Sequence, residues 1–198
     1  TPIREDVLQV KQVGNVQRFV IAFLPFGINQ FIKDIDFSEI SINIQLFSEE
    51  ECSSLFESTI SEKFSSIIES ILLEKIEIKE NLIVESAVEF IFAHYDNFSV
   101  NELSNYLGYS RKHINRVFKE NIGISIKKFH EIVLFRKTVD EKLFQTPTDS
   151  YTSISHKFNF TDQSHFNRLY KKMSSETPSQ FYKNGRLIGN KDTFWRIY

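Results

Sequence analysis

The sequence predicts a mainly α-helical chain whose C-terminal part holds two helix-turn-helix units, preceded by a small α+β segment. Two observations carry this prediction. From residue 48 onward, apolar residues recur at three- and four-residue steps, which is the periodicity of amphipathic helices. In addition, the motif of residues 113–119 returns at residues 165–171 in the same order, so that one helical unit occurs twice.

The front of the chain, residues 1–47, is expected to contain mostly strands. Residues 16–23 are rich in Val, Ile and Phe, and Pro25 and Gly27 end that run. Residues 28–37 fit a short helix or a loop.

Amphipathic helices are expected over residues 48–79. Three consecutive acidic residues, 49–51, stand where the N-terminus of a helix favours negative charge. Because consecutive side chains point around a helix rather than converge, we do not expect these carboxylates to form a metal site.

The composition excludes several classes of protein. Of the 198 residues, 41% are hydrophobic and 25% charged, as in globular proteins. The single cysteine, Cys52, excludes a disulfide framework and a Cys-rich zinc site. The longest apolar run, residues 19–28, is too short to cross a membrane. Because the first residue is Thr1 rather than Met, we expect a fragment or a processed product.

The net charge of −2 is the sum of two opposite parts. Residues 1–80 hold 7 Lys and Arg against 14 Asp and Glu, a net charge of −7. Residues 81–198 hold 17 against 12, a net charge of +5. An acidic front joined to a basic back predicts two parts with different partners. A basic excess of five is common in solvated helical domains and does not by itself indicate nucleic acid.

The two predicted helix-turn-helix units span residues 99–121 and 150–173. In the first unit, Ser99 and Ser110 are placed to cap the two helices, and Gly108 supplies the turn between them. A long helix is expected over residues 125–144, between the units. About twenty residues of helix are roughly 30 Å long, which is close to one turn of DNA.

The second helix of each unit has one apolar and one polar face. The apolar residues are Ile114, Val117 and Phe118 in the first copy and Phe166, Leu169, Tyr170 and Met173 in the second. Each polar face carries Arg, Lys and Asn and is short of carboxylates. Arg can hold guanine, Asn or Gln can hold adenine, and Lys reaches phosphates. The alternative is a helical hairpin whose polar face contacts only solvent. The occurrence of the same polar helix in two copies favours DNA contact.

Several motifs resemble a known family. They are Glu102-Leu103, Leu107-Gly108-Tyr109-Ser110, His113-Ile114-x-Arg116-x-Phe118-Lys119, Gly123, Arg136, Phe160-x-Asp162-Gln163-Ser164-His165-Phe166-x-Arg168, Lys171-Lys172, Thr177-Pro178 and Phe181-Tyr182. With these motifs, residues 81–183 resemble the DNA-binding domain of the AraC/XylS transcriptional regulators. The resemblance implies seven helices and two homeodomain-like helix-turn-helix units that read adjacent major grooves.

The resemblance also implies roles for individual residues. The base-reading positions are Lys112, Asn115 and Arg116 in the first unit and Gln163, Ser164, Asn167 and Arg168 in the second. Phosphate contacts are expected from Arg111, Lys119, Lys171 and Lys172. Residues 184–198 lie beyond the family pattern, as a C-terminal extension that is either packed or loose.

Four residues depart from the family pattern, all after the first unit. Asn159 and Ser175 stand where the family has Gly, and Asp140 and Ser155 where it has Ala. Asn still tolerates a left-handed backbone. We therefore expect the first unit to bind DNA more conventionally than the second.

The front of the chain permits two interpretations. Residues 19–27 resemble the last strands of the sensor domain found in one AraC-type subgroup. In that case residues 1–80 are a partial sensor or regulatory region, and the chain begins inside a domain whose larger part is absent. The other interpretation is a small α+β cap without a ligand role.

We expect a regulator rather than an enzyme. The five His residues form no metal-binding pattern, and no Gly-rich phosphate loop is present, so no catalytic residue, metal or cofactor is expected. The alternative is a protein-binding antagonist that keeps the fold but has lost specific DNA binding. The expected partners are double-stranded DNA, a small-molecule effector of the incomplete N-terminal region, a second copy of the chain and RNA polymerase. No membrane contact is expected, and the expected location is the cytoplasm, at the nucleoid.

Overall fold

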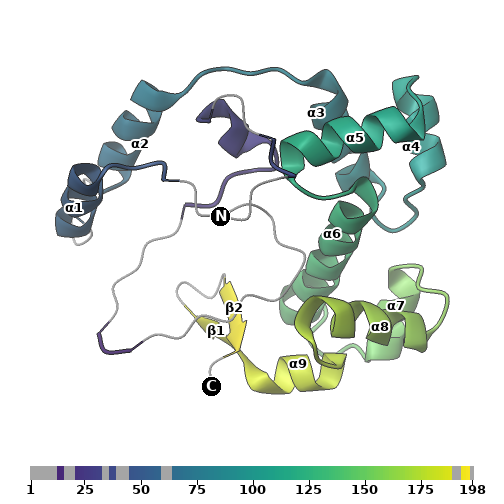
Figure 1. The fold of residues 1–198 in the computed structure, drawn as a ribbon. Helices are drawn as coiled ribbons and strands as arrows, with labels where there is room; N and C mark the ends of the chain where they lie inside the picture. The colour runs from purple at the N-terminus through teal and green to yellow at the C-terminus, as the bar shows by residue number, and fades with distance from the viewer. Residues whose placement is uncertain are drawn as a thin grey trace. The chain divides into compact units, whose positions relative to one another are not determined.

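The computed structural model describes residues 13–15, 21–32, 36–38, 45–58, 64–188 and 193–196, and this part of the chain is mainly helical (Figure 1). The first helices in chain order are a short 3-10 helix η1 (Gly27–Gln30), α1 (Glu49–Ser58) and α2 (Phe64–Lys75). They are followed by α3 (Leu82–Ala93), α4 (Val100–Leu107), α5 (Arg111–Ile122), α6 (Ile126–Asp140), a π-helical turn η2 (Glu141–Gln145), α7 (Tyr151–Lys157), α8 (Gln163–Ser174) and α9 (Pro178–Asn184). The predicted mainly α fold is confirmed, and α3 to α9 are the seven helices that the family resemblance implies.

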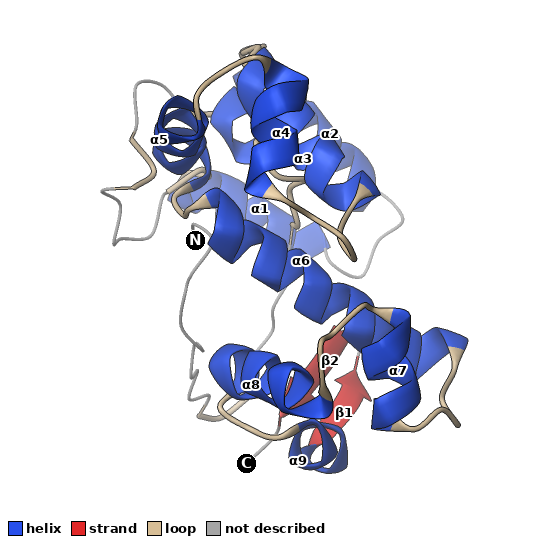
Figure 2. Ribbon diagram, turned by 90° about the vertical axis from the view of Figure 1, so that its right-hand side faces the viewer, coloured by secondary structure: helices blue, strands red, loops and turns tan. Residues whose placement is uncertain are grey.

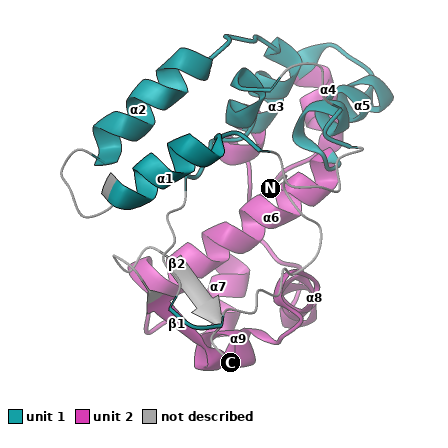
Figure 3. Ribbon diagram, turned by 60° about the vertical axis from the view of Figure 1, so that its left-hand side comes forward, with its two compact units in different colours: residues 1–4, 9–88, 107–125 teal, residues 5–8, 89–106, 126–198 magenta. Residues whose placement is uncertain are grey.

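The chain forms two compact units, which Figure 3 colours separately. The first contains the described residues up to Val88 together with residues 107–125, and therefore includes α5. The second contains residues 89–106 and the described residues from Ile126 onward, and therefore includes α4 and α6 to α9. The chain thus passes from one unit to the other within α3, again before the last residue of α4, and a third time just before α6.

Helices α1 and α2 in the first unit are fixed by local polar contacts. Ser48 and Glu51 cap the start of α1 reciprocally: the N–H of Ser48 donates to Glu51 Oε2 at 2.7 Å, and the N–H of Glu51 donates to Ser48 Oγ at 3.1 Å. Glu51 also pairs with Lys75 at the end of α2, with Nζ 2.9 Å from Oε1. The predicted helical region therefore has the acidic first turn that the sequence indicates.

The strand prediction for the front is wrong where the structure can test it. Of the predicted strand at residues 16–23, residues 16–20 lie outside the described residues, and residues 21–23 form no strand. The backbone instead turns at once: the N–H of Gly27 donates to the carbonyl of Leu24 at 2.8 Å, and Phe26 has a left-handed φ of 69°. This turn leads into η1, so the short helix considered for residues 28–37 is present at its beginning.

The front segment, residues 26–32 and 36–38, caps the C-terminal end of α5. The N–H of Phe37 donates to the carbonyl of Glu120 at 2.7 Å, and Asn29 Nδ2 donates to the carbonyl of Asn121 at 3.0 Å. Both acceptors belong to the last turn of α5, where carbonyls have no partner within the helix. Gly123 ends the helix with a φ of 92°, and a Cβ there would lie 3.0 Å from the carbonyl oxygen of Phe37.

The second unit is built around an aromatic core. Its buried members are Val139, Ile154, Phe158, Phe160, Phe166, Leu169 and Tyr170. Close to α6, His130 Nε2 donates to the carbonyl of Tyr95 at 2.7 Å, and the His130 ring stacks on Phe98 with a centroid distance of 4.6 Å. Burial lowers the pKa of His130.

The long helix expected over residues 125–144 is present, but its last turn is π-helical. Glu141 in η2 is buried, accepts a hydrogen bond from Thr146 Oγ1 at 2.8 Å and pairs with Lys157 Nζ at 2.7 Å. These contacts tie the end of the long helix to α7. The side-chain hydrogen bond from Lys157 lowers the pKa of Glu141 and keeps the carboxylate charged.

The C-terminal extension contains an antiparallel hairpin of β1 (Gly185–Ile188) and β2 (Thr193–Arg196), drawn red in Figure 2. Arg186 pairs with Trp195 and Leu187 with Phe194 in the register. The hairpin follows α9 directly, so residues 185–188 are ordered in a sheet.

Candidate nucleic-acid interface

Helix α5 begins and ends at the residues that the sequence indicates. Gly108 has a φ of 72° in the turn before it, and Ser110 caps it by accepting the N–H of His113 at 3.3 Å. Its core face consists of Ile114, Phe118 and Ile122, all buried. The apolar face predicted for this helix is therefore confirmed, with Val117 half-buried.

The opposite face of α5 carries every residue proposed for DNA contact in the first unit. Arg111, Lys112, Arg116 and Lys119 are exposed, and Asn115 is half-buried. Four exposed cationic side chains on one twelve-residue helix form a surface that attracts phosphate.

One carboxylate interrupts this basic surface. Arg116 Nη1 donates to Glu120 Oε1 at 2.7 Å and to Oε2 at 3.0 Å. The prediction that the face is short of carboxylates overlooked Glu120, although residues four apart on a helix are neighbours and the spacing gave the signal. Arg116 is therefore engaged within its own helix in this structure.

Helix α8 is built like α5. Asp162 caps it by accepting the N–H of His165 on Oδ1 at 2.7 Å, and Phe166, Leu169 and Tyr170 form its buried face. Asn159, at the position of Gly108, has a φ of 54°, which confirms the left-handed backbone expected there. The whole second helix-turn-helix, α7 and α8, lies in the second unit.

The two copies of the repeated His have the same packing role. The ring of His113 lies 5.3 Å from the ring of Tyr109, and the ring of His165 lies 5.2 Å from that of Phe160. In each unit the aromatic residue belongs to the turn and the His to the first turn of the following helix. The repeated His therefore holds the turn against the helix.

The polar face of α8 carries the remaining proposed residues. Gln163, Ser164, Arg168, Lys171 and Lys172 are exposed, and Asn167 is half-buried. Lys172 Nζ lies 2.6 Å from Glu131 Oε2 of α6, so this proposed phosphate contact is already ion-paired. Glu131 was not found from the sequence, because it precedes Lys172 by 41 residues and no local pattern links them.

A buried hydroxyl network fixes the base of α8. Tyr170 OH lies 3.1 Å from Thr138 Oγ1 of α6 and 2.6 Å from Tyr182 OH of α9. Burial raises the pKa of Tyr170 to about 12 and also raises the pKa of Tyr182. Both hydroxyls therefore stay protonated at neutral pH and can donate in this network. The network joins α6, α8 and α9 on the buried side of α8, opposite its polar face.

The described residues contain neither a metal-binding cluster nor a membrane-spanning helix. Among them, no group of three or more His, Cys, Asp or Glu could hold a metal ion. No helix in the described ranges is both long and apolar enough to cross a membrane.

Comparison with known proteins identifies the same part of the chain. Residues 103–184 match a family model described as a helix-turn-helix domain. An uncharacterized HTH-type transcriptional regulator of Staphylococcus aureus strain COL is 30% identical over 100 residues, which are 50% of this chain and 13% of that protein. The probable transcription factor PqrA of Proteus vulgaris is 28% identical over 93 residues, which are 46% of this chain and 74% of that protein. No solved structure matches the chain significantly.

The matched range contains α5 and α8 with their caps and turns. The 100 matched residues span only 13% of the length of the staphylococcal regulators, so the likeness concerns this part alone. Residues 103–184 are a helix-turn-helix domain of the AraC type, the family whose motifs the sequence carries.

Proposed function

We propose that the chain is a sequence-specific DNA-binding transcription regulator in which α5 and α8 read two adjacent segments of the major groove. The observation that carries the proposal is the repeated construction of these two helices. Each has a side-chain N-cap, a buried apolar face with at least one aromatic residue, and an exposed face with Arg and Lys. The two relatives, an uncharacterized HTH-type transcriptional regulator and a probable transcription factor, support the same function.

In this proposal the residues of each polar face divide into two roles. Bases are read by Lys112, Asn115 and Arg116 of α5 and by Gln163, Ser164, Asn167 and Arg168 of α8. Phosphates are bound by Arg111 and Lys119 of α5 and by Lys171 and Lys172 of α8.

Residues 81–183 would form the DNA-binding domain and residues 1–80 a regulatory region. An effector, a second copy of the chain and RNA polymerase are further partners that fit a regulator of this kind. Sedimentation of the chain with and without DNA tests whether two copies of it associate.

The decisive experiment is selection of bound sequences from a random duplex pool. A specific regulator enriches one motif, and Arg116→Ala or Arg168→Ala is expected to cost about 1–3 kcal/mol at that motif and to relax preference at one base pair. Arg186→Ala is the matched control, because Arg186 is an exposed arginine of β1 outside both helices. If the variant lost as much affinity for random DNA as for the motif, the arginine would contact the DNA backbone rather than a base.

Salt dependence provides an independent test. Four phosphate contacts would give a slope of log K against log salt of about −3.6, and three contacts about −2.7. The smaller value is expected if Lys172 stays paired with Glu131. A salt-independent interaction would contradict the proposed DNA surface.

One observation favours a second function. Arg116 and Lys172, one on each polar face, are engaged by carboxylates of the chain itself. A protein-binding regulator that keeps the fold but has lost specific DNA binding could retain such pairs. No binding to any duplex at low salt would favour this alternative.

A further inference from the structure

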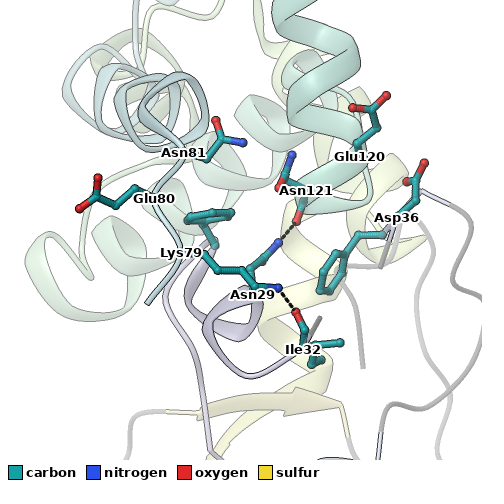
Figure 4. A pocket seen from close by; sticks show the side chains of 10 residues that line it. Asn29, Ile32, Asp36, Lys79, Glu80, Asn81, Glu120 and Asn121 are labelled. Atoms are coloured by element: carbon teal, nitrogen blue, oxygen red, sulfur yellow. Dashed lines mark hydrogen bonds between the residues drawn. The ribbon is translucent and has the colours of Figure 1, made fainter. Parts of the chain in front are cut away.

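A polar pocket of about 540 Å³ lies in the first unit, between the front segment and the end of α5 (Figure 4). Its polar lining comes from Asn29, Asp36, Lys79, Glu80, Asn81, Glu120 and Asn121. In Figure 4, Asp36 and Glu120 lie on one side of the pocket and Glu80 on the other. All of these residues belong to one unit, so the pocket does not depend on how the units are placed.

Asn29 leaves a buried acceptor at this pocket. The residue is only 5% exposed, and its Nδ2 donates to the carbonyl of Asn121. Its Oδ1 is buried and has no hydrogen-bond partner. A buried acceptor without a donor costs about 1–3 kcal/mol. Asn29 Oδ1 therefore lacks a donor, which a ligand with an N–H group would supply.

The charges of the lining also favour a donor that is positive. Asp36, Glu80 and Glu120 contribute three carboxylates against one ammonium, that of Lys79, which already donates to the carbonyl of Ile32 at 2.5 Å. Hydrogen bonds from the hydroxyl and the N–H of Ser38 lower the pKa of Asp36, so this carboxylate is charged at neutral pH. An anionic ligand would meet repulsion from both sides of the pocket.

The remaining walls suit a short carbon chain. Phe26 and Phe37 line the pocket, and both side chains are buried, at 7% and 4% exposure. The two phenyl rings give this polar pocket an apolar wall against which a short alkyl chain can pack.

We propose that this pocket binds a small organic cation, a primary ammonium ion on a short alkyl chain. Its N–H groups would donate to Asn29 Oδ1 and to the carboxylates of Asp36 and Glu120, and its alkyl chain would lie against the phenyl rings. An ammonium group has three N–H donors, one for each of these three side chains.

The same site has a consequence for Arg116, and this part rests on the proposed function. Glu120 lines the pocket and also holds Arg116 Nη1 through both carboxylate oxygens. A bound ammonium ion would compete with Arg116 for Glu120. The guanidinium would then be released for contact with a base, so that occupancy of the pocket raises DNA affinity.

The test begins without DNA. Calorimetry with n-butylammonium chloride at about 0.15 M salt is expected to give a Kd of about 1 mM or tighter. The matched probes are 1-butanol, which is neutral, and sodium butyrate, which is anionic. Glu120→Gln and Asn29→Leu are each expected to weaken butylammonium binding about tenfold or more. Glu57→Gln removes an exposed carboxylate outside the lining and should change nothing.

Several results would overturn the proposal. They are no binding of butylammonium at about 10 mM, equal binding of 1-butanol, stronger binding of butyrate, or an equal loss in Glu57→Gln. Asn29→Leu removes a hydrogen bond of the fold, so its circular dichroism must match the parent. Glu120→Gln keeps the backbone carbonyl that Phe37 uses and remains informative if Asn29→Leu unfolds.

The link to Arg116 is also measured without DNA. In ¹⁵N spectra of arginine side chains, butylammonium is expected to shift Arg116 and to leave Arg186 unchanged. Binding without a shift of Arg116 would refute the link and leave the pocket in place. Because neither measurement contains DNA, failure of the proposed DNA binding cannot be mistaken for failure of the pocket.

Discussion

Replacing Glu120 by Gln is expected to tighten DNA binding. The carboxylate holds Arg116 within α5, with both oxygens within 3.0 Å of one guanidinium nitrogen. Arg116 cannot make this contact and hold a base edge in full at the same time. Gln has nearly the same helix propensity as Glu, so α5 itself should be unchanged.

The magnitude follows from the exposure of the pair. The side chains of Arg116 and Glu120 are 58% and 37% exposed, so solvent screens most of their attraction. An exposed pair at this spacing stabilises a helix by about 0.3–0.5 kcal/mol. Removing the need to break the pair should therefore raise DNA affinity about twofold. Loss of a negative charge near the phosphates adds to this gain at low salt.

A double-mutant cycle separates the two contributions. Affinity for the selected duplex is measured by fluorescence anisotropy for the parent, Glu120→Gln, Arg116→Ala and the double variant. The part of the gain that comes from the pair should vanish when Arg116 is absent. The reasoning is refuted if Glu120→Gln binds no better than the parent, or if the gain is the same without Arg116. Glu57→Gln serves as the control for a change of net charge on an exposed surface.

Three further predictions concern stability, each measured by thermal unfolding. Ser175 ends α8 with a φ of 63°, so Ser175→Gly should stabilise the protein by about 0.5–1 kcal/mol, and a lower melting temperature would contradict this strain. Gly123→Ala should destabilise it by at least about 1 kcal/mol, because a left-handed φ of 92° and a Cβ 3.0 Å from the carbonyl oxygen of Phe37 act together; an unchanged midpoint would show that this turn relaxes. Burial lowers the pKa of His130 below its ordinary 6.5, so the unfolded chain binds more protons and stability is lost as the pH falls below about 6.5. His130→Gln should flatten this loss, and an identical pH profile would assign it to other groups.

Most of the local structure could be predicted from the sequence. Ser110 stands before a helix and accepts an N–H of its first turn, and Asn159 adopts the left-handed backbone that the position of a Gly requires. The apolar faces of α5 and α8 also follow from spacing alone, as the burial of Phe118 and Tyr170 shows. These features depend on residues within about four positions of each other, and there the sequence pattern is sufficient.

The features that could not be predicted depend on distant residues. The pairing of Lys172 with Glu131 joins positions 41 residues apart, and the bond of Asn29 to Asn121 joins positions 92 apart. The periodicity of the sequence does not indicate which loop will contact which helix end. Residues 21–24 form no strand although their composition favours one, because β propensity depends on packing and pairing with other parts of the chain more than on the residues themselves.

The cap that the front segment places on α5 has a practical consequence. The carbonyls of Glu120 and Asn121 take their donors from Phe37 and Asn29, which lie far earlier in the chain. A fragment beginning at residue 81 would leave both carbonyls to water, and α5 would fray from the end that carries Lys119. Dividing the chain where its net charge changes sign would therefore shorten a helix that we propose reads DNA. DNA affinities measured on such a fragment are expected to be weaker than those of the 198-residue chain.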